Sequence, residues 1–190
     1  MRAVLVSLVL VSLVASPVLA QSDHAATPEF RPIVGALVPT GDQRDVIEDA
    51  PLGGVQFGLE LHRDLHLCGT FAYARSEHRA LASRNAVNVW QMDVGLEKVS
   101  AFSPSNTWRL RPFAGLGAGV RIFDYGNRES KAENCPAVFG ALGVETQSHR
   151  LALRLEAREY ATRFRGIRGG ETASVRGDLF AMGSLALHFR

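Results

Sequence analysis

The chain has 190 residues, of which 46% are hydrophobic and 21% charged, and its formal net charge at pH 7 is +2. This balance argues against a protein that binds nucleic acid, because contact with phosphates selects a strongly basic surface. Once the N-terminal leader described next is set aside, about 170 residues remain, which suits a single domain.

The first twenty residues have the composition of an export signal. Met1 and Arg2 give a short positive start, and residues 3–14 form an apolar run interrupted only by serines. Small residues then lead to Ala20 and Gln21. This order predicts a secretory signal peptide over residues 1–20 that is cleaved between Ala20 and Gln21. An uncleaved anchor is the alternative, although the apolar run is short for a spanning helix.

From residue 30 onward, eight segments alternate apolar and polar side chains with the two-residue period of a β-strand. They cover about residues 30–39, 53–63, 65–75, 87–99, 110–123, 136–147, 151–161 and 175–190. Each is about ten residues long, the length at which a tilted strand crosses a bilayer. Long polar connections alternate with generally shorter ones, a pattern that is unusual in soluble sandwiches.

The seventh segment, LALRLEAREYA, is ambiguous because it consists largely of strong helix formers. On a helix its apolar residues would scatter around the whole cylinder. At a period of two, its leucines share one face, and Arg154, Glu156 and Arg158 share the other. We therefore predict a strand against the local propensity, because environment outweighs propensity in a segment this short. The alternative is a solvated helix carrying ion pairs.

The alternation does not show which face of the strands meets water and which meets lipid or the interior of the barrel. A soluble lipocalin-like barrel that binds a small apolar ligand buries its apolar face, whereas a membrane barrel exposes it. The uncharged face is nearly unbroken across five segments, and the other combines opposite charges with glycines that would make room for long arginines. This favours a membrane barrel with an interior ion network. Its predicted members are Glu60, Asp93, Glu97, Arg111, Arg121, Glu145, Arg154, Glu156 and Arg158.

Two ion pairs are expected within this network, because short connections bring neighbouring segments together. Glu97 is expected to face Arg111, and Glu145 is expected to lie diagonal to Arg154. Buried charges of this kind need partners, since removing one partner costs on the order of 3–5 kcal/mol.

The segments RPFAGLGAGVR, VFGALGVE, LALRLEAREY and LFAMGSLALHF resemble the eight-stranded outer-membrane β-barrel family, of the OmpA/OmpX transmembrane-domain type. The resemblance covers residues 30–190 and implies an all-β, antiparallel, up-and-down transmembrane barrel in a Gram-negative envelope. Residues 21–29 would be a short periplasmic segment, and the long loops would face outward. One departure is Arg190, which follows Phe189 where such chains commonly end in an aromatic residue.

The resemblance also implies a structural or surface-interaction role, because a lumen of eight strands is filled by side chains and is not an open pore. The implied partners are outer-membrane lipid, lipopolysaccharide and the barrel-insertion machinery. Arg163, Arg165 and Arg168 in the last outer loop are candidates for contact with lipopolysaccharide phosphates, the alternative being a solvated loop. The candidates for interfacial aromatic girdles are Phe71, Tyr73, Trp90, Trp108, Phe123, Tyr125, Tyr160 and Phe164.

A lipid-modifying outer-membrane enzyme is the main functional alternative, and some such barrels carry a His–Ser pair two residues apart. Here Ser148 and His149 are adjacent, and Ser184 and His188 would lie about 13 Å apart along a strand, too far for a nucleophile and its base. We therefore expect no catalytic site, and no motif predicts a cofactor or a metal. Cys68 and Cys135 are expected to lie towards opposite ends and to form no disulfide.

Overall fold

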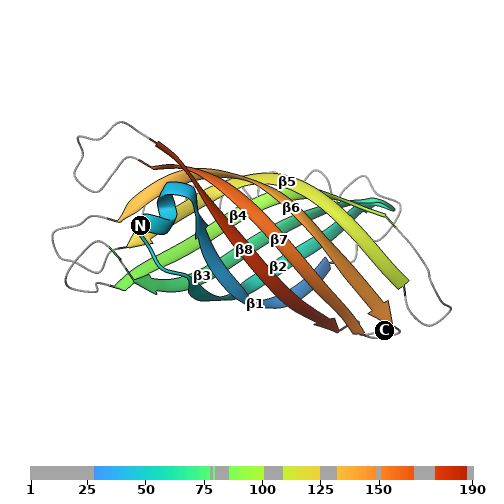
Figure 1. Ribbon diagram of the computed structural model, residues 1–190. Coiled ribbons are helices and arrows are strands. Elements are labelled where there is room, and N and C mark those ends of the chain that lie inside the picture. Colours follow the sequence, from blue (N-terminus) through green and yellow to red (C-terminus); the bar gives the residue numbers. More distant parts are fainter. Residues whose placement is uncertain are drawn as a thin grey trace.

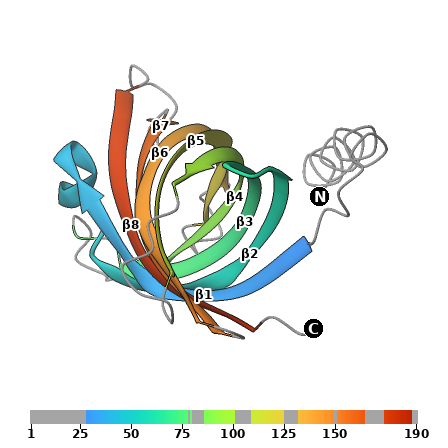
Figure 2. The ribbon, with the colours of Figure 1, turned by 90° about the vertical axis from the view of Figure 1, so that its right-hand side faces the viewer.

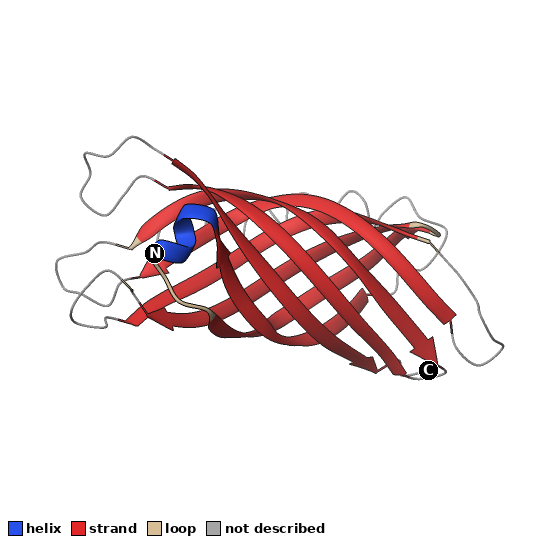
Figure 3. Ribbon diagram, in the orientation of Figure 1, coloured by secondary structure: helices blue, strands red, loops and turns tan. Residues whose placement is uncertain are grey.

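The computed structural model describes residues 28–77, 79, 86–100, 109–124, 132–148, 151–164 and 174–187. The predicted signal peptide, and all but the last two residues of the 21–29 segment, lie outside the described residues. Eight antiparallel strands dominate the described chain, accompanied by one 3-10 helix (Figures 1 and 3). Over that part of the chain, no helix is long and apolar enough to cross a membrane.

The strands follow each other around a closed barrel in sequence order, and β1 pairs with β8 to close it (Figure 2). The predicted up-and-down barrel is therefore confirmed. The elements are β1 (Pro28–Thr40), η1 (Gly41–Asp45), β2 (Ala50–His62), β3 (Leu65–Glu77), β4 (Ala86–Val99), β5 (Arg109–Asp124), β6 (Glu133–Ser148), β7 (Leu151–Phe164) and β8 (Ser174–Leu187).

The strands contain 13 to 16 residues, so the predicted length of about ten was too short. The structure extends strands beyond their predicted ends, for example β1 back to Pro28 and β3 on to Glu77. The helical alternative for the LALRLEAREYA segment is wrong, since all of it belongs to β7. Closure of the barrel supplies β7 with a partner strand on each side, and this environment overrides the local helix propensity.

The two ends of the barrel differ in their connections. We call the end with the tight turn Arg63–Asp64 the turn end, and the end with η1 the loop end. At the loop end, the segment after η1 folds back onto the end of β3. The backbone N–H of Glu48 donates to the carbonyl of Glu77 at 3.0 Å, and that of Arg79 donates to the carbonyl of Val46 at 2.9 Å. Ile47 between them is fully buried, so this connection packs onto the barrel.

Burial alternates along every strand, which separates an outward face from a lumen face. On β7 the residues from Leu151 to Arg163 are exposed and buried in strict alternation, with Leu155 57% exposed and its neighbour Arg154 buried. The exposed face carries large apolar side chains on most strands, including Val34, Leu116 and Leu142. The lumen face carries the buried charges. This distribution is the reverse of a soluble barrel.

Glycines on the lumen face make room for aromatic rings, a role that the sequence interpretation gave to arginine side chains. A Cβ atom on Gly95 would lie 2.7 Å from the ring of Phe139, and one on Gly117 would lie 2.5 Å from it. A Cβ on Gly143 would likewise collide with the ring of Phe113. The rings therefore pack against bare backbone, and Arg154 and Arg158 lie over the rings of Phe113 and Phe139.

Candidate functional site: the lumen network and the outward face

Arg158 of β7 is the centre of the lumen network and has no exposed surface. Its Nη1 donates to Asp93 Oδ1 at 2.7 Å and to Thr70 Oγ1 at 2.8 Å. Its Nε bonds the Glu156 carboxylate. The guanidinium also lies 4.6 Å from the ring centroid of Phe139, in range of a cation–π contact. Side chains from β3, β4, β6 and β7 itself thus converge on Arg158.

Arg154, four residues earlier on the same face, links the centre to the turn end. Its Nη2 donates to Glu97 Oε1 at 2.6 Å, and its Nε donates to Glu156 Oε2 at 3.0 Å. Its guanidinium lies 3.5 Å from the ring centroid of Phe113. Glu156 is therefore held between two arginines, as the sequence indicated. Gln56 Nε2 also donates to Glu156 Oε2, at 3.3 Å.

A second group lies at the turn end. Glu145 pairs with Arg31 at 3.0 Å and with Arg111 at 3.3 Å. Arg31 also pairs with Glu29 on its own strand. Arg111 Nη2 lies 3.3 Å from a ring nitrogen of His66. This group is more accessible than the centre, because the Arg111 side chain keeps about a fifth of its surface exposed.

A third group lies towards the loop end, where Arg121 pairs with Asp178. Arg121 Nε donates to Gln91 Oε1 at 2.9 Å. Its guanidinium lies 4.6 Å from the ring centroid of Tyr160 and 4.7 Å from that of Phe180. Tyr160 joins this group to the centre, because its hydroxyl donates to Asp93 Oδ2 at 2.7 Å. Charged and aromatic side chains thus follow one another through the lumen.

Most of the predicted network residues meet in these groups, but three details of the interpretation are wrong. Glu60 faces the lumen side of β2 but is exposed near the turn end, and none of the described ion pairs includes it. Glu97 does not face Arg111: its partner on β5 is Gly115, and its carboxylate reaches Arg154 instead. Barrel tilt brings together side chains from strands that are not neighbours, which explains the second error.

Glu145 and Arg154 are directly opposite each other in the β6–β7 pairing and not diagonal as expected. Their side chains lie 4.0 Å apart, the longest ion pair in the network. Sequence reasoning also missed several lumen residues, because they are isolated on otherwise unremarkable strands. These are Glu29, Arg31, Gln56, Thr70, Gln91, Tyr160 and Asp178.

Two of the predicted girdle aromatics are in fact interior. Phe123 and Tyr160 are buried on the lumen face, so the prediction that they belong to the interfacial girdles is wrong. Phe71, Tyr73 and Trp90 do form an outward cluster, with the Tyr73 and Trp90 ring centroids 4.4 Å apart. Trp108 and Tyr125 lie outside the described residues, as does the side chain of Phe164.

The structure describes only some of the residues considered for catalysis, disulfide formation, metal binding or lipopolysaccharide contact. Ser184 is buried on β8, and His149 and His188 lie outside the described residues, as does the side chain of Ser148. Cys68 and Cys135 are both buried and free. Within the described ranges, no group of three or more His, Cys, Asp or Glu is placed to hold a metal ion. Of the three predicted lipopolysaccharide contacts, Arg163 is exposed on β7, and Arg165 and Arg168 lie outside the described residues.

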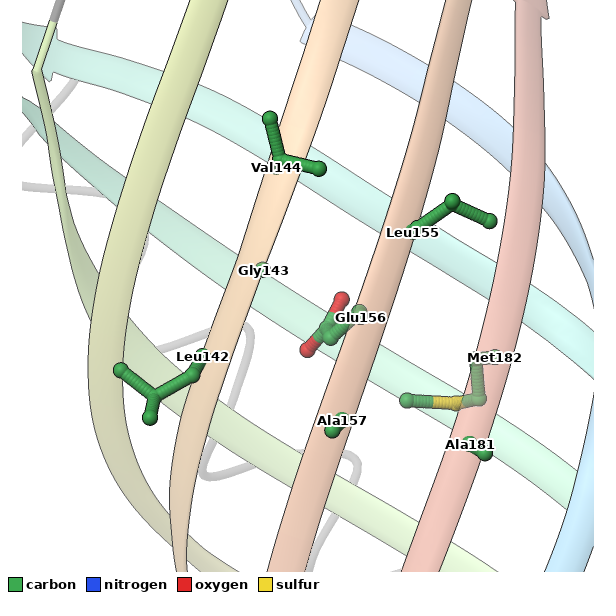
Figure 4. A pocket seen from close by; sticks show the side chains of 8 residues that line it. All are labelled: Leu142, Gly143, Val144, Leu155, Glu156, Ala157, Ala181 and Met182. Atoms are coloured by element: carbon green, nitrogen blue, oxygen red, sulfur yellow. The ribbon is translucent and has the colours of Figure 1, made fainter.

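The outward face has a feature of its own on β6, β7 and β8. A hollow of about 520 Å³ opens there, bordered by the outward-facing Leu142, Val144, Leu155, Ala157 and Ala181 (Figure 4). Leu142, Ala157 and Ala181 are consecutive cross-strand partners, so they form one row across the three strands. The small alanines in this row leave the space between larger neighbours.

The chain is similar to known proteins in structure. No protein-family model matches the sequence, and no curated protein sequence is similar to it. Neisserial surface protein A has a similar structure, with a TM-score of 0.58 and 12% sequence identity over 87% of this chain and 100% of that one. The outer membrane protein OprG from Pseudomonas aeruginosa gives 0.51 and 12%, over 87% and 95% of the two chains. The fold is therefore that of the small outer-membrane β-barrels.

Proposed function

We propose that the chain is a small outer-membrane β-barrel with a structural or surface-interaction role, whose lumen is closed by its ion network. The observation that carries this proposal is the inversion of the two faces. Arg158, Arg154 and Glu156 are buried inside the barrel, whereas large apolar side chains cover its outside. In a soluble barrel with this distribution, the apolar outer surface would be exposed to water. The charged side chains would be buried in an interior without water.

The proposal of a closed lumen is supported by the charged and aromatic side chains that lie inside the barrel. The buried Arg31, Arg121, Arg154 and Arg158 are each paired with a carboxylate within the barrel. Aromatic rings lie against three of these arginines. An eight-stranded barrel has room for little beyond its own side chains. A role as a channel for solutes is therefore disfavoured, and specificity is expected in the loop-end connections.

The proposal is tested by expressing the full-length chain in a Gram-negative host and fractionating the envelope. We expect the protein in the outer membrane, with a folded band that shifts on boiling before gel electrophoresis. N-terminal sequencing of that protein should begin at Gln21 if the leader is cleaved as predicted. Recovery from the soluble periplasm, with no shift on boiling, would contradict the membrane assignment.

Contact with lipopolysaccharide through the last outer loop remains part of this proposal. It is supported by the exposure of Arg163 near the loop end of β7, where its guanidinium is available to a phosphate. The barrel-insertion machinery is the expected partner during assembly. A variant in which Arg163, Arg165 and Arg168 are all glutamine should fold normally but retain less lipopolysaccharide after purification. Equal retention by the two proteins would remove this loop from the proposal.

A further inference from the structure

The outward aromatic side chains between the middle of the barrel and its loop end are gathered on two strands. Among the side chains that the structure describes, they are Phe71 and Tyr73 of β3 and Trp90 of β4. Tyr73 and Trp90 are cross-strand partners, and each lies four residues from the loop-end limit of its strand. An interfacial aromatic girdle surrounds a barrel. A cluster confined to two neighbouring strands therefore indicates a local binding surface.

The three rings form a connected platform, by which we mean Phe71, Tyr73 and Trp90 together. The ring centroid of Trp90 lies 4.4 Å from that of Tyr73 and 5.6 Å from that of Phe71. The Tyr73 hydroxyl donates to Asn88 Oδ1 at 2.8 Å, which ties the ring to the next outward residue of β4. Because the amide oxygen accepts this bond, the amide nitrogen is the donor end of Asn88. Phe71 and Trp90 remain 41% and 36% exposed.

A cation lies directly beyond the platform at the loop end. Arg75 is exposed, follows Tyr73 on the outward face of β3 and is the cross-strand partner of Asn88. It lies about 7 Å from Tyr73 along the strand. Arg75 takes part in none of the ion pairs recorded among the described residues. The surface thus changes from an apolar ring at mid-strand, through two amphipathic rings and an amide, to a positive charge.

We propose that this surface binds a phosphorylated glycolipid of the outer leaflet, with the chemistry of the lipid anchor of lipopolysaccharide. An acyl chain lies beside Phe71, and a sugar ring packs on Tyr73 and Trp90. The negative faces of aromatic rings attract the weakly positive C–H groups of a sugar. A phosphate on that sugar accepts hydrogen bonds from the Arg75 guanidinium, the group best shaped for it.

The neighbouring charges place the phosphate on the β3 side of the platform. Asn88 lies between Arg75 on β3 and Asp124 on β5 in one outward row. A carboxylate repels a phosphate but accepts hydrogen bonds from sugar hydroxyl groups. This site is separate from the proposed lipopolysaccharide contact of Arg163, because β5 and β6 lie between β4 and β7.

This inference rests on the proposed membrane location with the loop end facing outward, and the experiment separates the two. Trp108→Phe leaves Trp90 as the single tryptophan of the full-length chain, which has two. This protein is folded into phosphatidylcholine vesicles and titrated with bisphosphorylated lipid A. We expect a saturable change in Trp90 fluorescence. Dephosphorylated lipid A and phosphatidylglycerol should each need about threefold or more lipid for half-saturation, in line with an exposed charge pair.

Two variants in this background divide the site into its parts. Arg75→Gln should raise half-saturation by lipid A about threefold and abolish the preference over the dephosphorylated form. Tyr73→Leu should weaken binding of both forms to a similar extent.

Two matched controls carry the same changes to the turn-end half. Lys98→Gln removes an outward cation at the other end of β4, and Phe57→Leu removes an outward ring of β2. Both controls should bind lipid A as their parent does, and a folded band that shifts on boiling verifies that each variant is folded.

The outcomes are distinct. Failure of the unmodified chain to insert into vesicles would contradict the proposed function as well. Insertion with equal half-saturation by lipid A and phosphatidylglycerol, or unchanged lipid A binding in the Arg75→Gln variant, would overturn the glycolipid site alone. A stable dimer that is lost in the Tyr73→Leu variant would assign the platform to a second copy of the chain and would also overturn this site.

Discussion

The two faces of β7 share one backbone but obey different rules. On the lumen face, Arg154, Glu156 and Arg158 each need particular partners at hydrogen-bond distance. On the outward face, Leu153 and Leu155 have no comparable partners and need only be apolar. The lumen is therefore specified by the geometry of its partners, and the outer surface is specified by its apolar composition. Substitutions on the two faces should therefore differ in both size and chemistry.

The largest effect is expected from Arg158→Met, which deletes the centre of the lumen network. Asp93 and Glu156 would be left buried without their main cation, and breaking a buried pair in this way costs about 3–5 kcal/mol. The measurement is urea unfolding in lipid vesicles, followed by the fluorescence of the two tryptophans. Arg163→Met on the exposed face of the same strand is the matched control, and it should change the unfolding free energy by less than about 1 kcal/mol.

A double variant separates charge from packing at this centre. Arg158→Met combined with Glu156→Gln should be less unstable than the two single losses added together, because each change removes a charge that the other would strand. Simple additivity would mean that Arg158 acts only by filling space in the lumen.

The second-largest effect is expected on the outward face. There a charged side chain is destabilising, whereas the lumen face depends on its charged side chains. Leu155→Arg places a charge near the middle of β7, where an arginine facing lipid costs about 2–4 kcal/mol. We expect that loss in vesicles. In a short-chain detergent, whose looser micelle lets water reach the side chain, the loss should be smaller. An equal and small loss in both would show that this face does not meet hydrocarbon.

The sequence was sufficient to predict the fold because one signal repeats in eight segments. Each segment has a period of two, and even the helix-forming residues of β7 keep it. The ion-pair partners inside the lumen were harder to predict from the sequence, since they depend on the tilt of the strands and the closure of the barrel. Glu97 lies opposite Gly115 on the neighbouring strand, yet its carboxylate meets Arg154 from across the barrel. No short-range spacing carries that information.

Residue type also misled in two places on β7. Tyrosines gather at membrane interfaces, which predicts an interfacial Tyr160, but its position in the alternation is inward and its hydroxyl donates to Asp93. Glu159 lies on the opposite face, where the same alternation would have identified it as a charge among apolar residues. Position in the alternation was therefore the better guide than residue type, for both the interior and the exterior of the barrel.

The smallest predicted effect compares two glycines of β6 that face opposite ways. Gly143→Ala places a methyl group against the ring of Phe113 and the backbone of Leu155, so we expect a loss of about 1–3 kcal/mol from overpacking. Gly140→Ala meets open space on the outward face and should change stability by no more than about 0.5 kcal/mol. Both variants add the same methyl group to the same strand, so β-propensity cancels between them. A similar loss of stability at both positions would mean that glycine is needed for backbone flexibility and not to make room for the rings packed on the lumen wall.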